Sequence, residues 1–254
     1  MTWILPAEDL EPRHRGLAGG KAMALAEMAR QGLRVPRTLC LLTTAYDAFV
    51  DRSGLRERIL RELNRKDFQT MRWEEVWDCA SRIRHLFLRH PLPDDLAAAL
   101  ATAVQEAFGA APLAVRSSAV DEDSRGHSFA GLHESHVNVR GAAAVGERVR
   151  QVWASLWSDA ALLYRREIGL TAEDSAMAVV LQETVAGESS GVLFTRSPAD
   201  PRHAVLEAVH GLNQGLVDGS LSPDRWTLER DSGRILRHEP ARRIHRLRTA
   251  DGGG

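Results

Sequence analysis

The sequence predicts an α+β protein, with a helix-rich first part and a later part made largely of strands. Apolar residues recur at helical spacing in several segments before residue 170. From Ala176 onward, short apolar and β-branched runs are separated by turn residues, as in a sheet. The 254 residues, 44% hydrophobic and 26% charged, suffice for two lobes with cores of their own. We expect residues 1–110 as the helix-rich part of a first lobe, 111–175 as a hairpin with helices that complete it, and 176–254 as a mainly β second lobe.

The segment from Gly16 to Arg30 begins Gly-Leu-Ala-Gly-Gly-Lys and continues with apolar residues at helical spacing. This pattern predicts a glycine turn that leads into a helix, with Lys21 in the first turn. A cation there opposes the helix dipole, and a phosphate bound at the free amide groups would satisfy both. A turn with a solvated lysine is the alternative. The P-loop pattern G-x-x-x-x-G-K-[ST] is absent.

The next residues predict a buried strand and a series of packing helices. The strand covers 38–42, and Thr44 with Asp47 resembles a capping box at the start of the helix that follows. Further amphipathic helices are expected twice within 54–89, at 94–108, and over 142–168, where Ser158 is a cap that divides two helices.

The segment 112–141 predicts a hairpin. An apolar run ends at Arg116, and a polar loop rich in small residues follows before a returning strand at 132–139. Small residues allow backbone amides to approach a phosphate closely, so we expect the tip to lie over a polyphosphate. An ordinary surface hairpin with a salt-bridged arginine is equally consistent with the pattern. The loop is expected to hold Ser117, Ser118, Gly126, Ser128 and Gly131, and the strand's apolar positions are Leu132, Val137 and Val139.

Strands are expected at 177–185, 191–196, 204–211 and 225–230, the last turning through 231–233 into 234–240. The segment Gln182, Glu183 and Val185 would join the lobes, where its amide and backbone groups could bind an adenine edge. Gln182 starting a turn is the alternative. Glu207 would be a buried carboxylate, which needs a cation or a metal ion as partner.

Composition excludes some classes of function. The formal net charge is −1, so no overall field attracts the protein to nucleic acid or to a membrane. Cys40 and Cys79 cannot form a disulfide framework and fit a reducing cytoplasm. The first residues do not read as a signal peptide, and no apolar run reaches the roughly 18 residues that span a bilayer.

Four ordered blocks carry a family resemblance: GGKAMALAEMARQGLRVPRT, LAVRSSAVDEDSRGHSFAGLHESHVNV, VVLQETVAGESSGVLFTRSPADP and VLEAVHGLNQGLVDGSLSPDRW. Together they resemble the N-terminal nucleotide-binding region of the pyruvate phosphate dikinase and phosphoenolpyruvate synthase family, which includes rifamycin phosphotransferase. The resemblance covers most of residues 16–227. It implies an ATP-grasp-like fold that clamps ATP and Mg²⁺ between two lobes.

The resemblance also assigns roles to single residues. Lys21 and Arg116 match phosphate-contacting and catalytic positions, Gly131 and Ser135 match the loop that covers the phosphates, and Gln182 matches the adenine-side hinge. Such enzymes split ATP into AMP, phosphate and a phosphoryl group on a histidine. That histidine belongs to a swivelling domain, which then visits an acceptor-binding domain. We expect both domains on a continuing or a separate chain.

The sequence departs from the family pattern at several positions. Ser135 replaces a threonine, and the motif glycine-leucine-glycine-glutamate appears as Gly211-Leu212-Asn213-Gln214, without its carboxylate. The chain ends before the segment in which relatives carry acidic and amide residues that complete the ATP and magnesium site. We therefore expect the second lobe to lack its C-terminal part, and the metal ligands are unknown. None of His127, His133 and His136 is expected to be the phosphate carrier.

Three functions remain open at this point. The first is the ATP-binding portion of a phosphotransferase, with pyruvate or a rifamycin-like molecule as acceptor, inactive as an isolated chain. The second is a non-catalytic ATP-binding or regulatory module. The third is a degenerate relative that no longer binds nucleotide.

Overall fold

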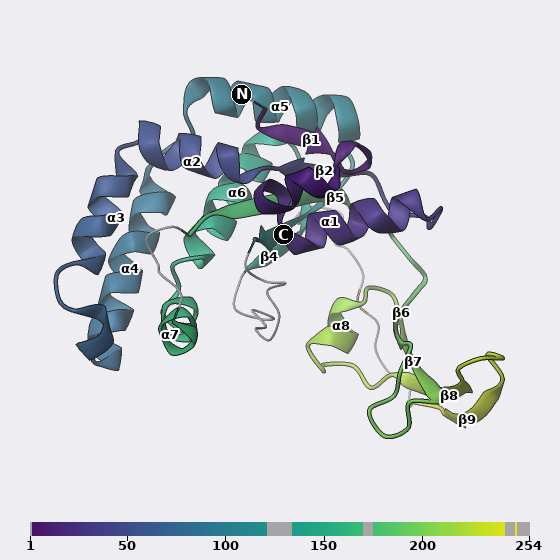
Figure 1. Cartoon of the computed structure of the whole chain (residues 1–254). Coiled ribbons are helices and arrows are strands. Elements are labelled where there is room, and N and C mark those ends of the chain that lie inside the picture. Colours follow the sequence, from purple (N-terminus) through teal and green to yellow (C-terminus); the bar gives the residue numbers. More distant parts are fainter. Residues whose placement is uncertain (1, 121–133, 170–174, 242–246, 248–254) are drawn as a thin grey trace. The chain divides into compact units, whose positions relative to one another are not determined.

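The computed structural model describes residues 2–120, 134–169, 175–241 and 247, and it divides them into two compact units. The first unit holds the described residues up to Thr184, and the second holds those from Val185 onward. Figure 1 shows the elements of both. In the first unit they are β1 (Ile4–Pro6), α1 (Arg15–Arg30), β2 (Thr38–Leu41), α2 (Thr43–Arg52), α3 (Leu55–Leu63), α4 (Trp73–Arg89), α5 (Asp94–Phe108), β3 (Leu113–Ala119), β4 (Ser135–Val139), α6 (Ala142–Ser155), α7 (Asp159–Ile168) and β5 (Met177–Glu183), with short 3-10 turns at Ala7–Asp9, Pro12–His14 and Phe68–Thr70. In the second unit they are β6 (Ser189–Phe194), β7 (His203–His210), α8 (Gln214–Val217), β8 (Asp224–Glu229) and β9 (Ile235–Glu239).

The first unit is built on a five-stranded sheet in the order β1-β2-β5-β3-β4, with every neighbouring pair antiparallel. Successive side chains of a strand point to opposite faces, so the sheet contributes to two cores. Leu113, Val115 and Val179 belong to the larger core, and Cys40, Ala178 and Val180 to the smaller. Helices α2 and α6 contact the larger-core side of the sheet, and α1 covers the smaller-core side.

Aromatic side chains fill the larger core between the sheet and its helices. Trp153 is fully buried, stacks on Phe49 at 5.3 Å between ring centroids, and meets Tyr46 edge to face at 5.8 Å. Both buried indoles also find acceptors: Trp153 Nε1 donates to the Met177 carbonyl at 3.0 Å, and Trp157 Nε1 donates to Tyr46 Oη at 3.1 Å. Trp153 and Trp157 are therefore core residues whose polar atoms are satisfied.

The helices predicted from amphipathic spacing are present in the structure. The helix expected at 94–108 is α5 with the same bounds, and Ser158 caps α7 by accepting a hydrogen bond from the Ala161 amide at 3.1 Å. The prediction of a capping box at Thr44 was wrong. Leu42 is the N-cap of α2, and Thr44 Oγ1 instead donates to the Thr2 carbonyl at 2.8 Å, because β1 lies beside this end of the helix.

The hairpin is formed by β3 and β4, which pair antiparallel, but it differs from the predicted one in two ways. Strand β3 runs on through Ser117 and Ser118, which we had expected in the loop, because β5 pairs with it as far as Ala119. Val139 is buried whereas Val137 is 44% exposed. Asn138 has a positive φ of 58° and the register shifts here, so the two valines do not share a face.

The expected boundary at 175/176 differs from the division that the structure makes at 184/185. Strand β5 pairs with β2 on one side and β3 on the other, so it lies inside the first sheet. Its run from Met177 to Leu181 is apolar on both faces because both faces are covered.

The second unit is built on a four-stranded antiparallel sheet in the order β6-β7-β8-β9. Glu207 was expected to be buried with a cation or a metal ion as partner; it is only partly buried, and Nη2 of Arg225 on the neighbouring strand lies 2.8 Å from its Oε1. Gly211 has a φ of 83°, and an added Cβ would lie 1.9 Å from the Leu247 carbonyl oxygen, so no side chain fits there. Among the described residues, no helix is long and apolar enough to cross a membrane.

Candidate functional site

Helix α1 carries the first predicted phosphate-binding residue, and it is interrupted just before that residue. Gly19 adopts φ 72° and ψ 172° inside the element, so the chain makes a first turn, breaks, and restarts as a helix with Lys21 in its new first turn. The predicted glycine turn is therefore present, with an additional helical turn before it. Lys21 is half-buried, and the neighbouring Ala22 is fully buried in the smaller core.

Strand β3 brings the second predicted cation to the same side of the sheet. Arg116 pairs in register with Val180 on one side and with Ser135 on the other, and residues directly opposite in an antiparallel pair share a face. Val180 packs in the core beneath α1. Arg116, Ser135 and α1 with Lys21 therefore belong to one face of the first sheet, which we call the α1 face.

Gln182 joins this face from β5. It pairs with Thr38 and Ala114, and its Nε2 donates to Thr38 Oγ1 at 3.0 Å, which holds the amide in place. Sequence reasoning did not single out Thr38 as the partner. Gln182 therefore lies within a strand, and the alternative that it starts a turn was wrong.

Glu183 and Val185 are placed differently. Glu183 pairs with Leu113 of the larger core, so its carboxylate lies on the opposite face, where Arg37 Nε lies 2.9 Å away. Its backbone amide donates to the Arg37 carbonyl at 2.9 Å. Val185 is 62% exposed and is the first residue of the second unit. Glu183 can therefore contribute only backbone atoms to the α1 face.

Several other predicted residues lie outside this face or outside the described chain. Gly131, Gly126, Ser128, Leu132, His127 and His133 are not among the described residues. His136 is on β4, as expected of a strand residue. Cys40 lies under α1, and burial raises the pKa of its thiol to about 12, so it is protonated and unreactive at neutral pH.

A magnesium site was expected only with unknown ligands. Within the described ranges, no group of three or more His, Cys, Asp or Glu side chains lies close enough to hold a metal ion. Magnesium takes oxygen ligands in near-octahedral order, commonly one or two carboxylates together with phosphate oxygens and waters.

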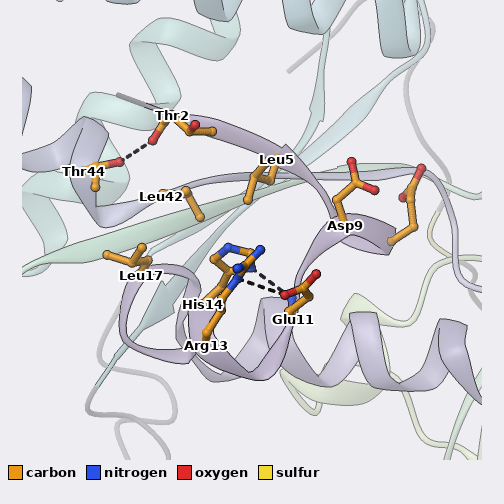
Figure 2. Close-up of a pocket in the computed structure, with 10 residues that line it drawn as sticks. Thr2, Leu5, Asp9, Glu11, Arg13, His14, Leu17, Leu42 and Thr44 are labelled. Atoms are coloured by element: carbon orange, nitrogen blue, oxygen red, sulfur yellow. Dashed lines mark hydrogen bonds and ion pairs between the residues drawn. The ribbon is translucent and has the colours of Figure 1, made fainter.

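A hollow on the surface of the first unit lies at the N-terminal end of α1 (Figure 2). Its floor is apolar, with Leu5, Leu17 and Leu42, and its rim carries Glu11 and Arg13, which form an ion pair at 2.9 Å. It contains none of the residues that the sequence predicted as a site. Arg13 lies in the 3-10 turn before α1 and is an exposed cation with Glu11 as its carboxylate partner.

Comparison with known proteins decides the family. The chain matches the family described as pyruvate phosphate dikinase, AMP/ATP-binding domain, over residues 15–253. It belongs to that family. The resemblance found from the four sequence blocks is thereby confirmed.

The named relatives of this chain include a synthase, a phosphotransferase and a further transferase. A phosphoenolpyruvate synthase of Aeropyrum pernix is 35% identical over 91% of this chain, and a rifampicin phosphotransferase of Streptomyces sviceus is 34% identical over 87%. A prodigiosin synthesizing transferase of Serratia marcescens is 35% identical over 92%. The chain spans 28%, 26% and 24% of the lengths of these relatives, so each relative contains much that this chain does not.

Sequence reasoning missed two residues of the α1 face at which α1 meets β3. Gly19 was grouped with other turn glycines, and Ser118 was assigned to the loop after Arg116. Ser118 could have been predicted from the alternation of β3, because in a strand that continues past Arg116 the side chain two residues later lies on the same face.

Proposed function

We propose that this chain is the ATP-binding part of an ATP-grasp-like phosphotransferase that splits ATP into AMP, phosphate and a phosphoryl group carried on a histidine of another domain. The family supports ATP binding, and its named relatives support phosphoryl transfer. The acceptor would be pyruvate or a rifamycin-like molecule, bound by a further domain on a continuing or separate chain.

One observation carries this proposal: Lys21 and Arg116 come from distant parts of the sequence to one face of one sheet. Two cations on one face suit a polyphosphate, which carries several negative charges close together. Lys21 supplies a compact ammonium and Arg116 a planar fork of donors. Ser135, directly opposite Arg116, and Gly131 would cover the phosphates.

The adenine would lie against Gln182, at the end of the face where β5 leads toward the second unit. In this assignment Gln182 contributes its side-chain amide, oriented by Thr38, while Glu183 and Val185 contribute backbone groups. Placing the base there leaves Lys21 and Arg116 for the phosphates. Magnesium, when bound, would neutralise further phosphate charge.

Calorimetry of ATP binding to the chain, with and without magnesium, tests the proposal. Lys21→Ala and Arg116→Ala should each raise the dissociation constant by several-fold or more, because each removes a charge-assisted contact to phosphate. The matched control is Arg13→Ala, which removes an exposed arginine paired with Glu11 and should change the dissociation constant little. Equal effects from Arg116→Ala and Arg13→Ala would refute the site assignment.

A non-catalytic ATP-binding or regulatory module is the second candidate, favoured by Gln214 in place of the family's glutamate. Gln214 begins α8 and is exposed. Incubation with ATP followed by separation of nucleotides distinguishes the two candidates when the phosphohistidine and acceptor domains of a relative are added. The proposal requires AMP to form in that mixture, whereas binding without AMP indicates the module.

A further inference from the structure

The break in helix α1 is bridged by one side chain from the sheet beneath it. In an uninterrupted helix, the amide of Ala22 would donate to the carbonyl of Ala18, four residues earlier. Here the Ala22 amide donates to Ser118 Oγ at 3.2 Å, and Ser118 Oγ donates to the Ala18 carbonyl at 2.7 Å. The serine hydroxyl has thus entered the helix hydrogen bond at the position where the helix breaks.

The backbone at the break is shaped to admit this serine. A Cβ on Gly19 would lie 2.1 Å from the Ser118 carbonyl oxygen and 2.8 Å from Ser118 Oγ. Any side chain at position 19 would therefore separate α1 from β3. Gly19 also has φ 72°, which glycine adopts without the cost that other residues pay.

Ser118 is 0% exposed, so the two hydrogen bonds form away from water. A buried hydroxyl that has lost its partners is costly, which makes the bridged arrangement strongly preferred over a displaced one. The bridge is therefore a rigid connection between the helix and the strand.

Ser118 stands between the two proposed phosphate-binding residues. Ala22, whose amide it holds, directly follows Lys21. Arg116 precedes Ser118 by two residues on the same face of β3, which is about 7 Å along a strand. The same hydroxyl therefore fixes the backbone that carries the lysine relative to the backbone that carries the arginine.

We propose that Ser118 is a positioning residue: its hydroxyl relays the broken Ala22-to-Ala18 helix hydrogen bond and thereby sets the separation of Lys21 and Arg116 for a polyphosphate ligand. This inference rests on the proposed function for its ligand, but the relay itself belongs to the free protein. Gly19 is also required for this relay, because only a glycine at that position lets the Ser118 hydroxyl reach both the Ala22 amide and the Ala18 carbonyl.

The test compares Ser118→Ala with Ser117→Ala in the full chain. Ser117 is the adjacent serine, 2% exposed, and faces the other side of the sheet, so it controls for loss of a buried hydroxyl on β3. Hydrogen exchange without nucleotide should show faster exchange for Ser118→Ala, confined to the amides of residues 18–23. Ser117→Ala should leave those amides unchanged. Equal exchange in the two variants overturns the relay.

The ligand arm uses ATP and adenosine as probes. Ser118→Ala should raise the dissociation constant for ATP about tenfold and leave that for adenosine unchanged, since the relay acts on the phosphate end alone. A merely structural role would weaken the binding of ATP and of adenosine together, and that result would overturn the positioning role. If Ser118→Ala does not fold, Ser118→Thr must keep the protection of residues 18–23 and the ATP affinity, and loss of either refutes the proposal.

The exchange and binding experiments distinguish failure of the proposed function from failure of the positioning role. If the unaltered chain binds no ATP, the proposed function fails while the exchange experiment still decides the relay. If the unaltered chain binds ATP and Ser118→Ala binds it equally well, the function stands and the positioning role fails.

Discussion

The two units differ in how their sheets are covered. In the first, helices cover both faces, and β5 is buried over its entire apolar run from Met177 to Leu181. In the described part of the second, Ala204 and Val209 are the buried apolar side chains, and β9 is exposed at all five positions. The first sheet is held by packing from both sides, and the second mainly by its own ladder of hydrogen bonds.

This difference bears on where a precise site can be built. Covered faces fix side chains and backbones by many simultaneous contacts, as at the close approach of Gly19 to Ser118. Strands with exposed faces rely on cross-strand pairs, such as Trp226 stacked on His238 at 4.7 Å. The residues proposed to bind phosphate accordingly lie on the packed unit.

The largest expected effect contrasts a tryptophan from each unit. Trp153→Ala should lower the free energy of unfolding by about 3–5 kcal/mol, because it leaves a cavity in the larger core and removes the hydrogen bond to the Met177 carbonyl. Trp226→Ala should cost about 1 kcal/mol, the order of a cross-strand pair. Urea unfolding measures both, and similar losses would contradict the contrast between the units.

The next effect concerns the break in α1. Gly19→Ala should lower the free energy of unfolding by about 2–4 kcal/mol, since it adds a methyl group against the Ser118 backbone at a positive φ. Gly16→Ala is the matched control, because nothing lies within 4 Å of its added Cβ. Its effect should stay within about 1 kcal/mol, and in the stabilising direction if any. A tolerated Gly19→Ala would show that α1 need not approach β3 so closely.

A smaller effect depends on pH. Burial and the nearby Arg148 hold the pKa of His136 below its usual 6.5, with Glu134 opposing them. The unfolded chain therefore takes up a proton near pH 6.5 before the folded chain does, so stability falls as the pH drops below that value. Urea unfolding at about pH 7.5 and about pH 5.5 should show less loss in His136→Gln than in the unaltered protein. The same loss in both would exclude His136 as the cause.

The smallest effect is expected in the second unit. Glu207→Gln removes the ion pair with Arg225, whose side chain is 53% exposed, so solvent screens much of the attraction. The expected loss is about 0–1 kcal/mol. Glu239→Gln breaks a more exposed pair with Arg237 and serves as control. A loss well above that of the control would mean that Glu207 is more deeply involved in the unit than its ion pair indicates.

Local patterns predicted the helices well, because the period of apolar residues and the caps act within a few residues. The bounds of α5 and the cap at Ser158 are examples. Predictions that depended on partners far apart in the sequence were less accurate. Strand β3 extends past Arg116 because β5 pairs with it, and Val137 turns outward because of the irregularity at Asn138. The Glu207 carboxylate was expected to need a cation or a metal ion, but only strand pairing identified Arg225.

The sequence by itself determined the α+β class, most of the elements, the family resemblance and the residue types suited to a polyphosphate. Only the tertiary structure decided that Lys21 and Arg116 share a face and that a serine joins their backbones. The physical reason is sequence separation. The hydrogen bonds of Ser118 link residues 96 and 100 positions apart, and contacts at that range follow from how α1 packs on the sheet.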